Sequence, residues 1–318
     1  HDIHPFHPRQ KKFQFPPLPL LEDEAVIETD PDADFLTKRI TERAVSFIKR
    51  NKDEPFFLYV PHPIPHKPLH VSPPFMKGVA SEITDKLKGE GNSVNYGTRD
   101  KLFRQAIAEI DWSVGQILDT LQAEGLDENT LVLFTSDNGP HKEGGHKADF
   151  FNSNGKYRGI KRDLYEGGIR VPTIAWWPGT IEPGSENDHQ WYFGDVMASA
   201  AELAGIAAPA DIDSDSFVST LRGAPPEKRW SRDSLLYWEF YEGGSAQAVR
   251  FGKWKAIRSP MFTGEVELYD LSWDFEENHD YAERRPKLVE HATDLLDKAH
   301  VPDPNWRVRQ SSKKRQAK

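Results

Sequence analysis

The chain contains no cysteine. This absence excludes disulfide bonds, thiolate zinc sites and a cysteine nucleophile within these residues. Long hydrophobic runs are absent too, since no stretch approaches the ~20 consecutive apolar residues that a membrane-spanning helix needs. Positive charge is scarce relative to negative charge, with a formal net charge of -9. Nucleic-acid binding requires a basic surface, so no nucleic-acid partner is expected, and an anionic ligand would have to be held by a local group of cations.

The chain does contain enough apolar material for a folded core. Of its 318 residues, 37% are hydrophobic and 11% are aromatic, which argues against disorder. This length predicts one large domain, or a large domain with a smaller one. Residues 1–20 show neither helix or strand periodicity nor a signal-peptide pattern, and the first residue is not Met. We therefore expect a processed or truncated polypeptide.

Hydrophobic periodicity predicts alternating helices and strands over most of the chain. Helices are expected where apolar residues recur every three to four positions, and buried strands where short apolar runs lie between Pro, Gly or polar residues. The expected helices are 34–51, 98–124 and 195–204, and the expected strands are 56–60, 130–135 and 172–176. This order predicts an α/β fold in which a mostly parallel sheet is sandwiched by helices. In such a sheet, a ligand binds beyond the carboxyl ends of the strands.

The pattern changes after about residue 230. The segments LLYWEF, QAVRFGKWKAIRS and VELYDL alternate in polarity and are joined by Gly-containing turns, which predicts a small antiparallel sheet. Residues 286–299 predict a closing amphipathic helix with Pro286 in its first turn. We therefore predict an α/β domain at 1–233, a small sheet-plus-helix subdomain at 234–305 and a basic, disordered tail at 306–318.

One polar stretch, TSDNGPHKEGG, follows an expected strand directly. Its Asp137 and Asn138 place two oxygen ligands at the strand end, which suits a hard cation such as Ca²⁺. Two ligands do not make such a site by themselves, and Asn-Gly is also a favoured turn dipeptide. Taken alone, the stretch is more typical of a turn.

Two further loops carry groups suited to an anion. The loop PHPIPHKPLH places His62, His66 and His70 between prolines, and a histidine beside an anion can act as a general acid. An exposed loop with unused histidines fits that pattern equally well. Residues 152–172 contain five Lys or Arg and four Gly, which suits a sulfate or phosphate site or, alternatively, a solvated basic loop.

Taken together, these loops resemble the motifs of the type I sulfatases, the arylsulfatase-like branch of the alkaline-phosphatase superfamily. The resemblance rests on FFLYVPHPIPHKPL, FTSDNGPHKEGG, YRGIKRDLYEGGIRVPTIAWWPG and VELYDLSWDFEENHDYAERRPKLV, in this order, and covers nearly all of residues 35–305. It implies an alkaline-phosphatase-like fold, a Ca²⁺-dependent sulfuric ester hydrolase and a sulfated small molecule or glycan as substrate. By family analogy, it also implies a periplasmic or secreted parent protein.

The resemblance also implies roles for single residues. Asp137 and Asn138 match calcium ligands, and His66 matches the histidine that protonates the leaving alcohol. Lys161 matches the lysine that holds the sulfate and its bridging oxygen, and His141 matches a position that contacts the substrate. These roles agree with the chemistry, because a cation at the sulfate and a proton donor at the leaving oxygen both stabilise the charge that develops as the S–O bond breaks.

The chain departs from the family pattern at the nucleophile. That group is a formylglycine made from Cys or Ser in a Cys/Ser-x-Pro-x-Arg signature, and the Ser-x-Pro at Ser72 is followed by Met76 where Arg is needed. The family's first Asp-Asp calcium pair and the Lys and His after the nucleophile are missing too. We therefore expect an N-terminally incomplete fold with half an active site, which cannot turn over substrate alone.

Three functions remain open from the sequence. The first is a sulfatase fragment that is active only with a further N-terminal segment. The second is a non-catalytic protein that binds anions or sulfated glycans, and the third is a phosphatase or phosphonate hydrolase of the same superfamily. A missing opening strand would also leave part of the sheet uncovered, so self-association is expected.

Overall fold

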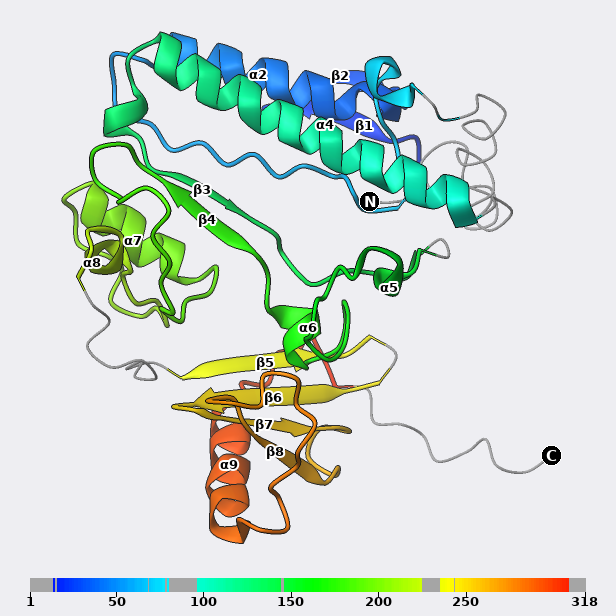
Figure 1. The fold of residues 1–318 in the computed structure, drawn as a ribbon, viewed down its shortest axis with the longest axis vertical. Helices are drawn as coiled ribbons and strands as arrows, with labels where there is room; N and C mark the ends of the chain where they lie inside the picture. Colours follow the sequence, from blue (N-terminus) through cyan, green and yellow to red (C-terminus); the bar gives the residue numbers. More distant parts are fainter. Residues whose placement is uncertain are drawn as a thin grey trace. The chain divides into compact units, whose positions relative to one another are not determined.

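The computed structural model describes residues 14, 16–67, 69–77, 79, 96–143, 146–224, 235–242 and 244–308 (Figure 1). The chain divides into two compact units. Unit 1 contains His1–Leu131 and His141–Phe151, and unit 2 contains Val132–Pro140 and Asn152–Lys318. Most of the predicted disordered tail, from residue 309 onward, lies outside the described residues.

Two long helices lie side by side in unit 1 (Figure 1). They are α2 (Leu36–Arg50) and α4 (Tyr96–Ala123), which confirm the predicted helices 34–51 and 98–124. Their buried apolar side chains include Ile48 and Leu102, each of which contributes roughly 1.5–3 kcal/mol by leaving water. A hydrogen bond of 2.6 Å between the buried hydroxyls of Thr41 and Ser113 also joins the two helices.

Shorter elements complete unit 1. A hairpin precedes α2, single turns of 3₁₀-helix lie on either side of α4 in the sequence, and a one-turn helix follows residue 147. These elements are β1 (Pro19–Glu22), β2 (Ala25–Thr29), η1 (Ala33–Phe35), η2 (Pro73–Met76), η3 (Asp127–Asn129) and α5 (Ala148–Phe151).

The strand predicted at 56–60 is not present as a strand. The segment forms no β-ladder with any residue that the structure describes, and its outward-pointing Phe57 and Tyr59 are 69% and 67% exposed. The prediction of a buried strand is therefore wrong. A strand needs a neighbouring backbone to complete its hydrogen bonds, and the side-chain pattern does not reveal whether one is present.

The next two expected strands form a pair in unit 2. They are β3 (Val132–Thr135) and β4 (Thr173–Trp176), and they pair antiparallel, with Val132 opposite Trp176 and Thr135 opposite Thr173. The prediction of parallel strands is wrong for this pair. The described part of residues 136–172 contains only four-residue helices, α5 and α6 (Glu166–Ile169), and no long crossover helix of the kind that joins parallel strands.

The C-terminal part of unit 2 is a four-stranded antiparallel sheet in the order β5-β6-β7-β8. These strands are β5 (Leu236–Phe240), β6 (Ala246–Phe251), β7 (Trp254–Arg258) and β8 (Val266–Asp270), followed by α9 (Pro286–Ala299). The predicted sheet plus helix is thus confirmed. The helix α7 (Asp195–Leu203) confirms the helix expected at 195–204. A single helical turn, α8 (Val218–Leu221), follows α7 in the sequence. The domain boundary at residue 233 stays a prediction.

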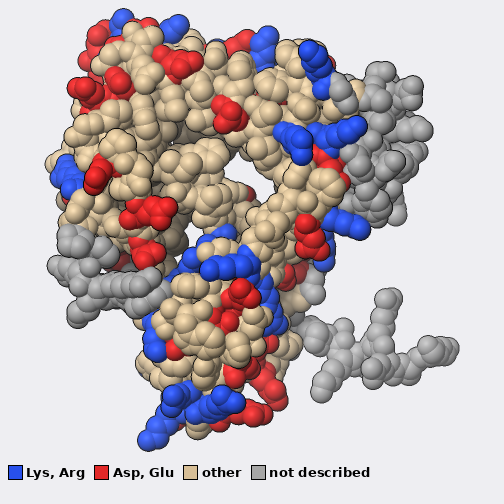
Figure 2. Space-filling view, viewed as in Figure 1, with Lys and Arg blue, Asp and Glu red and all other residues tan. Residues whose placement is uncertain are grey.

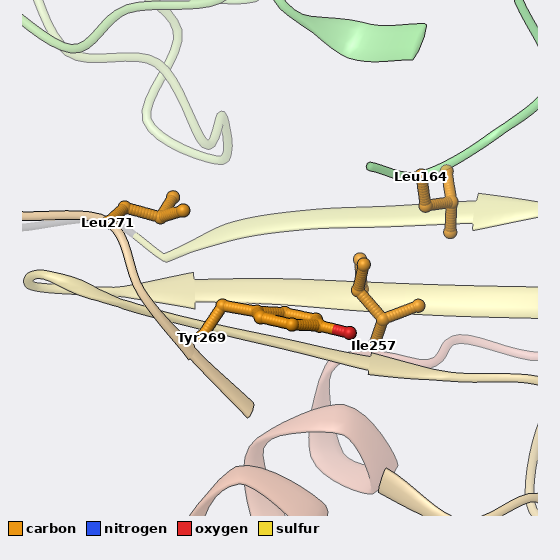
Figure 3. Packing of buried hydrophobic residues seen from close by; sticks show 5 residues of the cluster. Leu164, Ile257, Tyr269 and Leu271 are labelled. Carbon is orange, nitrogen blue, oxygen red and sulfur yellow. The ribbon is translucent and has the colours of Figure 1, made fainter. Parts of the chain in front are cut away.

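The two faces of this sheet bury different partners. On one face, α9 packs its Ala292 and Leu296 against Val249, Ala256 and Leu268. On the opposite face, Leu164 packs against Ala248, Ile257, Tyr269 and Leu271 (Figure 3). Leu164 belongs to the basic loop of residues 152–172, so that loop is attached to the sheet by apolar burial.

Charges of both signs are interspersed on the surface shown in Figure 2. This distribution fits the net negative charge better than a continuous basic face for nucleic acid. Among the described residues, no helix is both long enough and apolar enough to cross a membrane.

Candidate active site

His66 lies in the proline-rich loop of unit 1 and is half-buried. Its amide donates a hydrogen bond to the carbonyl of Pro63 at 3.2 Å, and its Nδ1 lies 2.6 Å from the carbonyl of Lys67. A carbonyl oxygen only accepts, so Nδ1 must carry the proton in this contact. The Nε2 atom has no hydrogen-bond partner among the residues that the structure describes, which leaves it able to accept or deliver a proton.

His141 lies beside His66 in the same unit, with the two ring centroids 5.9 Å apart. It is buried, and its Nε2 donates to the carbonyl of Pro65 at 3.1 Å. Its Nδ1 accepts from the amide of Glu143 at 3.1 Å. Both ring nitrogens thus contact the protein, so His141 is held rigidly against the His66 loop, and its predicted substrate contact stays a prediction.

The other two histidines of the proline-rich loop attach it to helices. His62 Nε2 lies 3.1 Å from the hydroxyl of Ser113 on α4, and burial lowers the pKa of His62. His70 Nδ1 lies 2.8 Å from Oδ1 of Asp34. These contacts indicate structural roles for His62 and His70.

The sequence interpretation missed His146. This histidine is 5% exposed, stacks on Phe103 at 4.3 Å and lies 5.5 Å from the ring of His141. Its Nδ1 is 3.8 Å from Oδ1 of the buried Asp100. Burial and the neighbouring His141 lower the pKa of His146 despite Asp100. The short spacing of His141 and His146 was the available signal, but it does not show that both rings turn toward one aromatic side chain.

Asp137 and Asn138 lie in unit 2, separated from the end of β3 by Ser136 alone. Asp137 is exposed and Asn138 is half-buried, and the Ser136 hydroxyl donates to the Asn138 carbonyl at 3.1 Å. Neither Asn138 nor Gly139 has a positive φ, so the dipeptide is not the type I′ hairpin turn that Asn-Gly favours. The structure therefore does not contain a type I′ hairpin turn at Asn138–Gly139.

Gly139 is required for close approach to α6. Its amide donates to the carbonyl of Gly168 at 2.9 Å, and a Cβ atom at position 139 would lie 1.9 Å from the carbonyl oxygen of Gly167. No side chain fits in that space. The Asp137–Asn138 pair is thus supported directly by the double glycine of α6.

Lys161 contacts the same backbone segment, next to Gly139. Its amide donates to the carbonyl of Pro140 at 2.8 Å, and the neighbouring Ile160 amide donates to Oδ2 of Asp163 at 2.9 Å. The structure therefore brings Asp137, Asn138 and Lys161 together through backbone contacts within unit 2. His66 and His141 belong to unit 1.

The basic residues of 152–172 differ in what their charged groups contact. Arg158 donates to the Tyr269 hydroxyl and the Glu277 carbonyl, both at 3.0 Å. Arg170 donates to Glu166 at 2.9 Å, and Arg162 donates to Glu242 at 2.8 Å. The half-buried Lys161 has no partner for its ammonium group among the described residues. Of this set, Lys161 is the best candidate for binding an external anion.

Comparisons with known proteins identify the family of the chain. The model of the family described as Sulfatase matches residues 7–206, and a model described as N-sulphoglucosamine sulphohydrolase, C-terminal, matches residues 157–301. The chain is 36% identical to steryl-sulfatase of Rattus norvegicus over 208 residues, which is 64% of this chain and 33% of that protein. It is 31% identical to N-acetylgalactosamine-6-O-sulfatase of Bacteroides thetaiotaomicron over 281 residues, which is 81% of this chain and 50% of that protein.

A solved structure concerned with the metabolism of multiple glycosaminoglycans by Bacteroides thetaiotaomicron superposes with a TM-score of 0.66 at 29% identity. The superposition covers 85% of this chain and 56% of that one, and it confirms the predicted fold class. The chain thus spans between a third and a half of the length of these two curated relatives. The family match over residues 7–206, which contain both groups of site residues, shows that the chain belongs to the sulfatase family.

Proposed function

We propose that the chain supplies part of the active site of a sulfatase that hydrolyses sulfate esters of carbohydrates. The observation that supports the proposal is the backbone hydrogen bonding that joins Lys161, which carries a cation, to the segment of Asp137 and Asn138, which carry hard oxygen ligands. The relative named N-acetylgalactosamine-6-O-sulfatase supports a carbohydrate substrate. By family analogy, we also propose a periplasmic or secreted location, which cell fractionation tests.

In this proposal, Lys161 binds the sulfate group and its bridging oxygen. The S–O bond to the alcohol breaks with negative charge growing on the leaving oxygen, and the fixed ammonium charge lowers the energy of that state. For His66, on unit 1, the family resemblance is the basis for proposing the role of general acid, with Nε2 delivering the proton to the leaving oxygen. The hydrogen bond from Nδ1 to the Lys67 carbonyl holds the ring in orientation both before and after the transfer.

Asp137 and Asn138 would provide two of the oxygen ligands of a calcium ion. When bound, Ca²⁺ would offset the negative charge of the sulfate oxygens. Such an ion takes six to eight oxygen ligands. No group of three or more His, Cys, Asp or Glu among the described residues could hold a metal, so we propose that the remaining ligands lie elsewhere.

The nucleophile of this reaction is not found among the described residues. Ser72, the serine nearest to the family signature, is 1% exposed, and its amide donates to Oε2 of Glu109 at 2.9 Å. It is therefore buried against the α4 helix. We propose that a segment outside these 318 residues provides the formylglycine, and that the chain alone binds sulfate without turning over an ester.

The test combines the upstream coding sequence with an assay. An in-frame Cys/Ser-x-Pro-x-Arg segment, and hydrolysis of an aryl sulfate by the protein that contains it, would support the proposal. A complete protein that binds inorganic sulfate in calorimetry but leaves aryl sulfate intact would instead support a non-catalytic sulfated-glycan-binding protein. Preferential hydrolysis of aryl phosphate would support a phosphatase of the same superfamily.

A further inference from the structure

Lys255 on β7 is completely buried, which is rare for lysine unless its charge is paired. Its Nζ lies 2.9 Å from Oε1 of Glu166 and 2.9 Å from Oε1 of Glu277. The side chains of both glutamates are also buried. These three residues, here called the buried ionic triad, join the sheet, the α6 turn and the loop after β8.

Two further cations lie near the triad. Arg170 Nε donates to the second carboxylate oxygen of Glu166 at 2.9 Å, and the charge of Arg250 also acts on both glutamates. Burial by itself would raise the pKa of Glu166, but Lys255, Arg170 and Arg250 outweigh it and lower the pKa to about 2. The pKa of Glu277 is raised, mainly because the side chain is buried. Glu166 is therefore ionised at neutral pH.

The triad is connected to the candidate site through α6. The amide of Glu166 donates to Oε2 of Glu277 at 2.7 Å, so both ends of Glu166 are attached to the triad. The next residue, Gly167, donates to the carbonyl of Arg158 at 2.6 Å, and Gly168 accepts the hydrogen bond from Gly139. Gly168, whose carbonyl supports the segment of Asp137 and Asn138, thus lies only two positions after the ion-paired Glu166.

The contacts around α6 leave little room for displacement. A Cβ at Gly167 would lie 2.2 Å from the carbonyl oxygen of Gly159, and one at Gly168 would lie 2.1 Å from that of Asp163. The segments 137–140, 158–163 and 166–169 therefore contact one another with backbone against backbone. A shift of α6 would move the backbone of Lys161 and of Asp137–Asn138 with it, because close-packed interiors transmit displacements.

We propose that Lys255, together with Glu166 and Glu277, positions the candidate sulfate and calcium residues by holding α6 against the C-terminal sheet. The apolar contact of Leu164 with the same sheet face attaches this loop, but apolar contact is non-directional (Figure 3). The triad supplies the directional contacts that set the position of α6. The assignment of Lys161, Asp137 and Asn138 as site residues rests on the proposed function, whereas the mechanical link does not.

Stability alone does not account for the triad. Replacing a buried ion pair by apolar residues is often neutral or stabilising, whereas removing one partner leaves an unpaired buried charge. Lys255→Met alone would remove the cation that contacts the Glu277 carboxylate at 2.9 Å and is expected to be strongly destabilising. The double variant Lys255→Met/Glu277→Gln removes one charge of each sign, keeps the Glu166–Arg170 pair and is expected to fold.

The experiment measures amide hydrogen exchange of the full chain. In Lys255→Met/Glu277→Gln, the amides of Gly139 and Lys161 are expected to exchange roughly 10- to 100-fold faster than in the unchanged chain. This factor equals the loss of metal affinity or activity that follows when a residue supporting a metal ligand is replaced. The control is Lys253→Met, which removes the 2.7 Å ion pair between an exposed lysine and the buried Asp270 of the same sheet. That control is expected to leave both amides unchanged.

Equal exchange at Gly139 and Lys161 in the double variant and the control would overturn the proposal. If the double variant fails to fold, the unchanged chain still decides the matter. Its Gly139, Lys161 and Gly168 amides must then open in the same cooperative step as those of β7, and independent opening would also overturn the proposal. Titration with inorganic sulfate tests the proposed function separately, since a chain that binds no sulfate can still show the exchange coupling.

Discussion

The amide of Lys161 donates a hydrogen bond of 2.8 Å to the carbonyl of Pro140. Pro140 follows Asp137–Asn138–Gly139 directly in the sequence, so one contact joins the candidate anion-binding lysine to the candidate calcium ligands. The two loops are separate segments of the sequence, but this backbone hydrogen bond joins them in unit 2. A change on either loop is therefore expected to affect the other.

Lys161→Ala is expected to abolish sulfate-ester turnover by the complete protein while folding is retained. Because the ammonium group has no partner among the described residues, its loss leaves no buried charge unpaired, and the free energy of unfolding should change by no more than about 0.5 kcal/mol. Steady-state kinetics with an aryl sulfate and urea denaturation check the two parts. Lys156→Ala, whose ammonium lies 5.0 Å from the Phe275 ring centroid, is the control and should retain turnover. Normal turnover by Lys161→Ala would reject the catalytic role of that lysine.

Gly139→Ala is expected to lower the free energy of unfolding by about 1–3 kcal/mol, because the added methyl group overlaps the Gly167 carbonyl. Gly115→Ala on α4 is the matched control, since a Cβ there meets nothing within 4 Å. Replacing an interior helical glycine by alanine should stabilise the protein by up to about 1 kcal/mol. Urea denaturation measures both variants, and effects of the same sign would contradict this account of Gly139.

Calcium binding by the chain alone is expected to be weak. Asp137 and Asn138 provide two oxygen ligands, whereas complete sensor sites provide a full shell and reach roughly micromolar dissociation constants. Calorimetric titration measures the affinity, and Asp137→Asn should weaken it further. Micromolar or tighter binding would mean that the chain contains calcium ligands beyond these two.

The free energy of unfolding of the protein is expected to fall in mild acid because of the buried His146. The folded-state pKa of His146 is lowered, chiefly by burial, so the unfolded chain binds the proton more readily. The stabilising effect of the neutral ring is therefore complete above the unfolded pKa of about 6.5 and is lost as the pH falls below it. The free energy of unfolding, measured against pH, should fall less steeply in His146→Gln. His291→Gln, at an exposed position on α9, is the control. If the free energy of unfolding falls equally steeply with pH in His146→Gln and His291→Gln, His146 is not the source of the pH dependence.

The exposed face of β3 and β4 is expected to promote self-association. Phe134 and Ile174 lie opposite each other in the antiparallel register, and both are exposed. Paired exposed apolar side chains on a short sheet invite contact with another chain. Phe134→Ser/Ile174→Thr should reduce the association seen in light scattering. The exposed Ile206 lies after α7, and Ile206→Thr should leave association unchanged.

Local patterns in the sequence predicted most of the helices and the C-terminal sheet. Helices α2, α4 and α7 and the β5–β8 sheet follow from periodicity that their own residues carry. The strand at 56–60 and the direction of β4 were wrong because both depend on a partner strand. Periodicity describes the faces of a strand but not the backbone beside it.

The sequence alone determined the family and the residue types available for chemistry, since these are properties of order and spacing along the chain. It also determined that these 318 residues contain no cysteine nucleophile. Only the tertiary structure decided which of the five basic residues in 152–172 contact protein partners, and that the two glycines of α6 support Asp137–Asn138 and Lys161. The physical reason is that hydrogen bonds and ion pairs join residues far apart in sequence, such as Glu166 with Lys255, and no local pattern records which residues meet.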